Sequence, residues 1–193
     1  MGHILTVIRH RRAVRKNCFR AGIPWRGIVH DLSKYSPTEL IPGIRFYQGN
    51  RSPNEREREL FGYSKAWLHH KGRNRHHFEY WNDVNMTTHR YEPVKMPAVF
   101  AVEMFCDRVG ASKVYRGKNY TDADPLNYFL RGNARAKMHP ETADELERRL
   151  RLLAEKGEKE AFAEIRAEVK AARRAEKEAR RAEKKKLKGS PEK

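Results

Sequence analysis

The sequence predicts an all-α protein, a helical bundle followed by a charged helical tail. Apolar residues recur at helical spacing through most of the chain, and no run alternates between apolar and polar residues as a half-buried strand would. The 193 residues carry 42 Lys and Arg against 25 Asp and Glu, a net charge of +17. This excess favours an anionic partner such as a phosphate ester or a nucleic acid.

Prolines, glycines and capping sequences mark where the expected helices of the first 140 residues begin and end. These helices cover residues 3–21, 24–34, from 37 onward, 53–71, 74–81, 97–110 and from 124 onward. The sequences Ser36-Pro-Thr-Glu39 and Ser52-Pro-Asn-Glu55 are the capping boxes. Residues 82–96 and 111–123 are expected to form loops.

The residue types change near residue 140. All three tryptophans, all nine histidines and eight of the nine prolines lie within residues 1–140. We therefore expect a helical domain over 1–140, packing helices over 141–169 that break at Gly157, and a basic tail over 170–193 that is helical or disordered. The tail either binds nucleic acid without sequence specificity, through phosphates, or only keeps the protein in solution.

The composition argues against several classes of protein: membrane-spanning, secreted and disulfide-rich proteins. No run approaches the roughly 20 apolar residues that a bilayer span requires, and the N-terminus lacks the apolar core of a secretory signal. Two cysteines, Cys18 and Cys106, are too few for a disulfide framework. We therefore expect a cytoplasmic protein without a membrane partner.

A histidine followed by an aspartate, His30-Asp31, can place an imidazole and a carboxylate on one divalent metal ion. The alternative is a capping aspartate beside a surface histidine. His10 lies on a stripe otherwise suited to burial, and Asp107 lies in the most apolar helix with Glu103 one turn before it. Because an unpaired buried charge is costly, these two carboxylates indicate a nearby cation, either a metal or an arginine.

Four further histidines lie close together in the segment AWLHHKGRNRHHFEYW. By helical spacing His70 shares a face with Tyr63 and Trp67, so it is the inward candidate of its doublet. The spacing does not distinguish His76 from His77. Neutral imidazole binds several transition metals, so the cluster predicts a metal without naming it.

The order H…HD…H…H…D resembles that of the HD-domain superfamily, and HDLSK is close to the HD-x-G-K segment of its two-metal phosphodiesterases. The segments HDLSKYSPTE, YQG, AWLHHKGRNRHHFEYW and MPAVFAVEMFCDR are similar to an uncharacterised family of small bacterial and phage proteins, over about residues 3–135. The superfamily resemblance implies an all-α bundle with metal in its interior.

The resemblance also implies roles for individual residues. The ligands of a first ion would be His10, His30, Asp31 and Asp107. The ligands of a second ion would be Asp31 as a bridge, His70, and either His76 or His77. The expected catalytic residues are Lys34, His70 and His77. The expected substrate-binding residues are Lys34, Arg11, Arg73 and Arg75. One or two divalent transition-metal ions (Mn, Fe, Co, Ni or Zn) are the expected cofactor.

The function expected from these residues is metal-dependent phosphohydrolysis of a nucleotide or another phosphate ester. Two alternatives remain open: a di-iron oxygenase on the same scaffold, and a non-catalytic nucleic-acid-binding protein whose histidines are structural. The basic composition favours phosphate chemistry over oxygen chemistry. The substrate, the metal and the oligomeric state are left open by the sequence.

Overall fold

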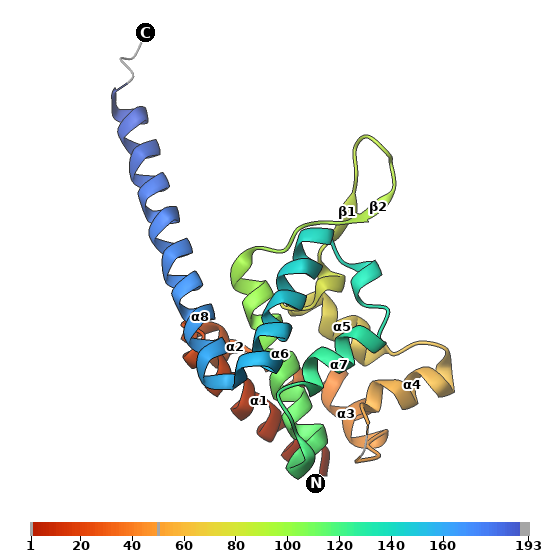
Figure 1. Ribbon diagram of the computed structural model, residues 1–193. Coiled ribbons are helices and arrows are strands. Elements are labelled where there is room, and N and C mark those ends of the chain that lie inside the picture. The colour runs from red at the N-terminus through yellow and green to blue at the C-terminus, as the bar shows by residue number, and fades with distance from the viewer. Residues whose placement is uncertain (1, 50, 190–193) are drawn as a thin grey trace.

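The computed structural model describes residues 2–49 and 51–189, with the side chains of residue 182 onward left out. In this part of the chain the fold is all-α apart from one short hairpin (Figure 1). The helices are α1 (Gly2–Arg20), α2 (Pro24–Val29), α3 (Pro37–Arg45), α4 (Pro53–Phe61), α5 (Lys65–Arg73), α6 (Ala98–Arg116), α7 (Asp124–Arg131) and α8 (Pro140–Gly189). Short 3-10 turns are η1 (Leu32–Tyr35), η2 (Phe78–Tyr80), η3 (Gly117–Asn119) and η4 (Arg135–Lys137).

The centre of the bundle is α6, in which every residue from Ala101 to Cys106 is buried. Helix α1 packs directly against it, because Gly110 leaves room for Val14: a Cβ at Gly110 would lie 2.7 Å from Cγ2 of Val14. The same helix α1 approaches α2 at Gly27, where a Cβ would lie 2.7 Å from Cβ of Cys18. These two close approaches set the distance of α1 from both of its neighbours.

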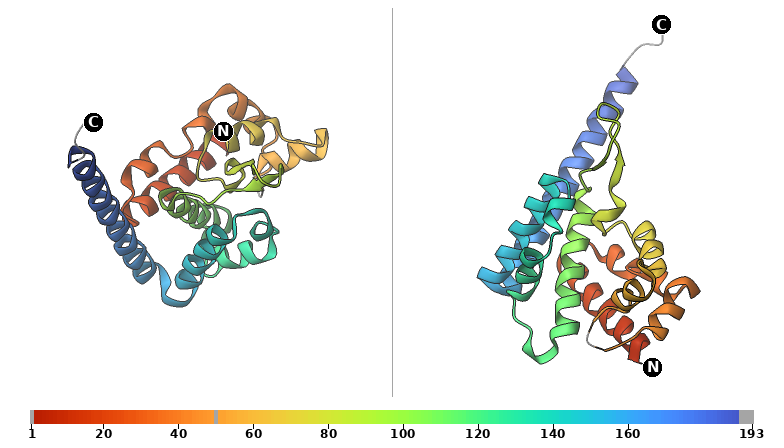
Figure 2. Two further views of the ribbon diagram at one scale, coloured as in Figure 1. Left: turned by 90° about the horizontal axis from the view of Figure 1, so that it is seen from above. Right: turned by 90° about the vertical axis from the view of Figure 1, so that its right-hand side faces the viewer.

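Helix α8 consists of two helices that meet at Gly157, whose φ of 76° and ψ of 170° are not helical. The break was expected from the sequence. Before it, Leu146, Leu150 and Leu153 are fully buried. After it, Phe162 packs against Phe105 of α6 with ring centroids 5.5 Å apart. The last turns then leave the body of the protein, as two further views show (Figure 2).

Two expected helices are shorter in the structure than in the sequence prediction. The helix expected over 24–34 ends at Val29, because His30 has a non-helical ψ of 129° and Asp31 then adopts a left-handed conformation with φ 53°. The helix expected over 53–71 is divided into α4 and α5, because Gly62 is also left-handed, with φ 77°. Both breaks are conformational and are not visible in the hydrophobic pattern.

Three other expectations were also wrong in detail. The helix expected to end at Gly110 continues to Arg116, since Gly110 serves packing and not termination. The expected helix over 74–81 is reduced to the turn η2. The loop expected over 82–96 contains an antiparallel hairpin of β1 (Asn82–Val84) and β2 (Tyr91–Pro93), which projects from the body (Figure 1).

Among the described helices, none is long and apolar enough to span a bilayer.

Candidate metal centre

The centre is built on the turn that follows α2. His30 has an extended backbone and Asp31 a left-handed one, and each residue is 1% exposed. A left-handed non-glycine residue is strained, and such strain concentrates at functional sites. Arg11 of α1 stabilises the turn: its Nε donates to the carbonyl of His30 at 2.8 Å and its Nη2 to that of Ile28 at 3.2 Å. Arg11, expected to bind substrate, uses these two donors on the backbone.

The first group of potential ligands consists of His10, His30, Asp31 and Asp107. Nε2 of His10 lies 3.0 Å from Oδ1 of Asp107 and 3.5 Å from Oδ2 of Asp31. Nε2 of His30 lies 3.4 Å from Oδ2 of Asp31 and 3.5 Å from Oδ1 of Asp107. An ion about 2.1 Å from each ligand would separate neighbouring ligand atoms by about 3.0–3.4 Å. The four side chains fit one ion with little movement.

The second group consists of Asp31, His70, His76 and His77. Oδ1 of Asp31 lies 3.3 Å from Nε2 of His70 and 3.4 Å from Nε2 of His76. Both histidines of the second doublet reach this group, whereas one of the two was expected. Asp31 therefore presents one carboxylate oxygen to each group, the arrangement of a carboxylate that bridges two ions.

Buried polar atoms without hydrogen-bond partners also mark the second group. Oδ1 of Asp31, Nε2 of His76 and Nε2 of His77 are all buried and unpaired in the described part of the chain. Buried polar atoms are nearly always paired, because leaving them unpaired is costly. A metal ion bound to these three atoms would satisfy them together.

Two carboxylates outside these two groups orient the imidazoles, and one of them, Glu103, also forms a third possible ligand group with His30 and His76. Nδ1 of His30 lies 3.0 Å from Oε1 of Glu103, and Nδ1 of His70 lies 2.7 Å from Oε2 of Glu39. A carboxylate only accepts, so each Nδ1 carries a proton, and Nε2 is the nitrogen that would bind an ion once the imidazole is neutral. The other oxygen of Glu103 accepts from Nε of Arg26 at 2.6 Å. Glu103 therefore accepts from Arg26 with one oxygen and orients the imidazole of His30 with the other.

Glu39 was assigned to a capping box by the sequence, and that role is wrong. Ser36 caps α3 without a side-chain hydrogen bond, and both oxygens of Glu39 face α5, where they contact His69 and His70 at 2.7 Å. A capping box and an inward carboxylate have the same local pattern, so only the packing of α3 against α5 distinguishes them. His69 is held outside the metal groups by this contact.

The electrostatics of the centre favour a cation. Burial opposes ionisation of Asp31, but the charges of His30 and Lys34 keep its pKa well below the usual range. Burial likewise opposes charge on His30, but Asp31 outweighs it, together with Asp107 and Glu103, and raises the pKa of His30 to about 10. The carboxylates are therefore ionised. Without an ion they hold a proton on His30, and a bound metal ion would displace that proton.

Lys34 lies at the solvent side of the centre. Its Nζ is 2.8 Å from Oδ2 of Asp31 and 3.3 Å from Nε2 of His70, and its side chain is 27% exposed. The side chains of His10 and Asp107 are also partly exposed, at 11% and 18%. A substrate would reach the first group from the side where these three residues lie.

The remaining expected residues lie elsewhere. Tyr63, expected to share the buried face of His70, is 57% exposed, because the break between α4 and α5 separates the two. Arg73 and Arg75 are exposed, and the guanidinium of Arg75 lies 5.8 Å from the ring of Tyr80. Within the described residues, neither arginine forms an ion pair with the carboxylates of the centre.

A family model with the description "Family of unknown function (DUF5662)" matches residues 1–152. No curated protein and no solved structure matches the chain. The matched residues include both groups of potential ligands and end within the first half of α8.

Proposed function

Since the chain belongs to the DUF5662 family of unknown function, we propose from its own residues that it is a metal-dependent phosphohydrolase of the HD type. Its substrate would be a nucleotide or another phosphate ester. The observation that carries the proposal is the position of Asp31, whose two oxygens face two different sets of imidazole nitrogens. That arrangement suits a pair of divalent ions that act on one phosphate.

The order of the ligands supports the same proposal. His10, the His30-Asp31 pair, the middle histidines and Asp107 follow one another as in the HD-domain pattern, and they come from α1, the turn after α2, α5 with the segment that follows it, and α6. Residues so far apart in the chain meet in one buried cluster. Three buried atoms of this cluster lack a hydrogen-bond partner in the described part of the chain, and a bound ion would supply one.

Ions bound here would polarise the phosphoryl group and lower the pKa of bound water to about 7. The chain's own residues would do the rest. Glu103 and Glu39 keep the imidazoles oriented, and Arg11 holds the strained turn. Lys34, partly exposed beside Asp31, would place its ammonium against a phosphate oxygen and stabilise its negative charge.

The test combines elemental analysis with a phosphate-release screen over nucleotides. Asp31→Asn is the informative variant, because asparagine tolerates the left-handed conformation and should preserve the fold. We expect it to lose bound metal and phosphate release together. Asp83→Asn, on the exposed hairpin, is the matched control and should keep both.

Two results would overturn the proposal. The first is full metal content and unchanged phosphate release in Asp31→Asn. The second is bound iron with substrate-dependent oxygen uptake and no phosphate release from any ester, which would assign the same residues to an oxygenase.

A further inference from the structure

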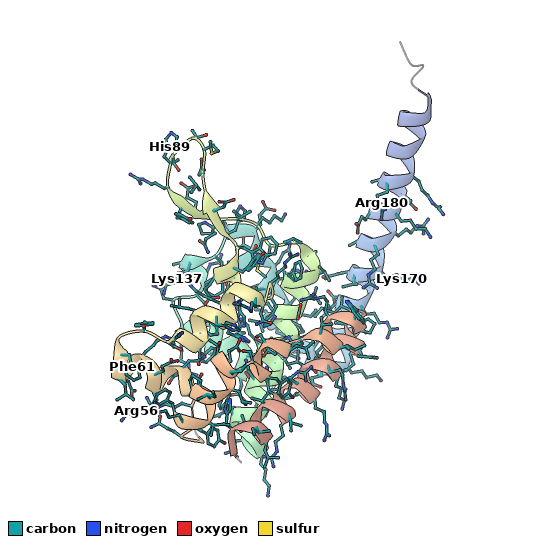
Figure 3. The ribbon with its side chains drawn as sticks, turned by 180° about the vertical axis from the view of Figure 1, so that it is seen from behind. Arg56, Phe61, His89, Lys137, Lys170 and Arg180 are labelled. Atoms are coloured by element: carbon teal, nitrogen blue, oxygen red, sulfur yellow. The ribbon has the colours of Figure 1, made fainter. Side chains whose placement is uncertain are left out.

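The second half of α8 forms a projecting arm, which we define as residues 170–181. Every one of these residues is exposed, and the views of Figures 1 and 3 show the helix rising away from the bundle, with Lys170 and Arg180 on it. Among the side chains of α8 up to residue 181, the last buried one is Ile165. Since the arm buries no apolar face, packing does not explain its sequence.

Charge is distributed unevenly around the arm. At about 100° per residue, all six basic residues fall within one arc of about 120°, and the four alanines fall on the opposite side. The basic residues are Lys170, Arg173, Arg174, Lys177, Arg180 and Arg181. Glu176 and Glu178 lie at the two edges of the basic arc, and Glu178 is paired with Arg174 at 2.9 Å.

We propose that this basic face of the arm binds the phosphate backbone of double-stranded DNA without reading its sequence. The six residues extend over about 17 Å of helix, and the duplex carries about one negative charge per 1.7 Å of its axis. A single α-helix fits the major groove of B-form DNA. Arginine, four of the six residues, binds phosphate through paired donors.

An anionic membrane is a poorer partner for this arm. Helices that lie on membranes bury large apolar side chains opposite their basic face. The face opposite the basic residues here carries Ala171, Ala172, Ala175 and Ala179, whose methyl groups bury little area. The arm therefore offers charge without an apolar anchor. The proposal is independent of the metal centre, which lies in the bundle.

The test measures binding of the full-length protein to a fluorescein-labelled 20-base-pair DNA duplex across a salt series. The test variant carries Arg173→Gln, Lys177→Gln, Arg180→Gln and Arg181→Gln. Four lost phosphate contacts should reduce the slope of log affinity against log salt by about 3.5 and weaken binding at least about tenfold at 0.1 M salt. The matched control, Ala171→Gln, Ala175→Gln and Ala179→Gln, should bind as the wild type does.

Circular dichroism checks that the arm stays helical, as glutamine is a good helix former. If the first variant is less helical than the wild type, a second variant with only Arg180→Gln and Arg181→Gln replaces it. For this variant the slope of log affinity against log salt should be smaller than that of the wild type by about 1.8. Three results would overturn the proposal: an unchanged slope in the charge variants, no DNA binding by the wild type at low salt, or equally tight binding to phosphatidylserine vesicles. Phosphate release from a small ester should be unchanged in all variants, which separates this test from that of the metal centre.

Discussion

Nδ1 of His30 lies 3.0 Å from Oε1 of Glu103, and both side chains are completely buried. Because the carboxylate can only accept, His30 donates from Nδ1, and its Nε2 faces Asp31 and Asp107. The hydrogen bond from His30 and the nearby His76, whose Nδ1 lies 3.4 Å from Oε1 of Glu103, overcome the effect of burial and lower the pKa of Glu103 to about 2. Glu103 thus orients the imidazole without being a ligand of the first group.

Glu103→Gln is therefore expected to weaken divalent-ion binding by about 10–100-fold. The glutamine keeps the size of the side chain, but it no longer holds His30 by charge and leaves Arg26 without its ion pair. A competition titration against a metal-responsive dye measures the affinity. Glu160→Gln, exposed on α8, is the control and should bind like the wild type. Equal affinities in the two variants would contradict an orienting role.

The first histidine doublet provides a second prediction. His70→Ala should remove one of the two ions that Asp31 would bridge, because Nε2 of His70 faces Oδ1 of Asp31 at 3.3 Å. His69→Ala should keep both ions, because His69 bonds to Glu39 and belongs to none of the ligand groups in the described part of the chain. Metal per chain and phosphate release are measured for both variants, with thermal unfolding to confirm that each is folded. Equal metal content in the two variants would mean that His70 is not a ligand.

These residues also show what the sequence could and could not predict. Helical spacing predicted the burial of His70, although Tyr63, one of the two residues on which that prediction rested, is exposed. The strained turn at Asp31 was not predictable, because it depends on Arg11 of α1, nineteen residues before His30. The role of Glu39 depends in the same way on α5, thirty residues further on. Local patterns predict helices and their faces, whereas contacts between helices decide which polar groups meet.

Arg11 leads to a third prediction, concerning stability. Arg11→Ala should destabilise the fold by about 1–3 kcal/mol, because the carbonyls of Ile28 and His30 lose their donor. It should also weaken metal binding, since the His30-Asp31 turn is then free to relax. Denaturant unfolding and metal titration measure the two effects. Arg12→Ala, exposed on the same helix, should change neither. A variant with normal stability and metal affinity but a raised KM would instead make Arg11 a substrate-binding residue.

A fourth prediction concerns acid stability. Glu158, just after the break in α8, accepts from Arg20 of α1 at 2.6 Å and pairs with Lys113 of α6. Burial opposes its ionisation, but hydrogen bonds from Lys113 and Arg20 hold its pKa below the usual 4.5. A carboxyl with a lowered pKa stabilises the fold above its unfolded-state pKa and loses that contribution as the pH falls through its folded-state value.

Glu158→Gln should accordingly lower the free energy of unfolding by about 1 kcal/mol at neutral pH. The difference in this free energy between the variant and the wild type should shrink as the pH falls below 4.5. Urea unfolding at pH 7 and at several acidic values measures this difference. The exposed Glu160→Gln should follow the wild type at every pH. A difference that is constant with pH would mean that packing, and not the ion pairs, attaches this half of α8.

The last prediction concerns where the folded body ends along α8. For a chain that stops at Val169, the free energy of unfolding should lie within about 0.5 kcal/mol of that of the full-length protein. The reason is that residues 170–181 are all exposed and bury no core surface. Its metal content should also be unchanged.

A chain that stops at Lys156 loses Phe162 and Ile165, which are 2% and 0% exposed. Each buried side chain of this size contributes about 1.5–3 kcal/mol, so this shorter chain should be several kcal/mol less stable. Thermal and denaturant unfolding of the two truncations, side by side, measure the difference; equal stabilities would mean that the segment between residues 157 and 169 is not part of the core.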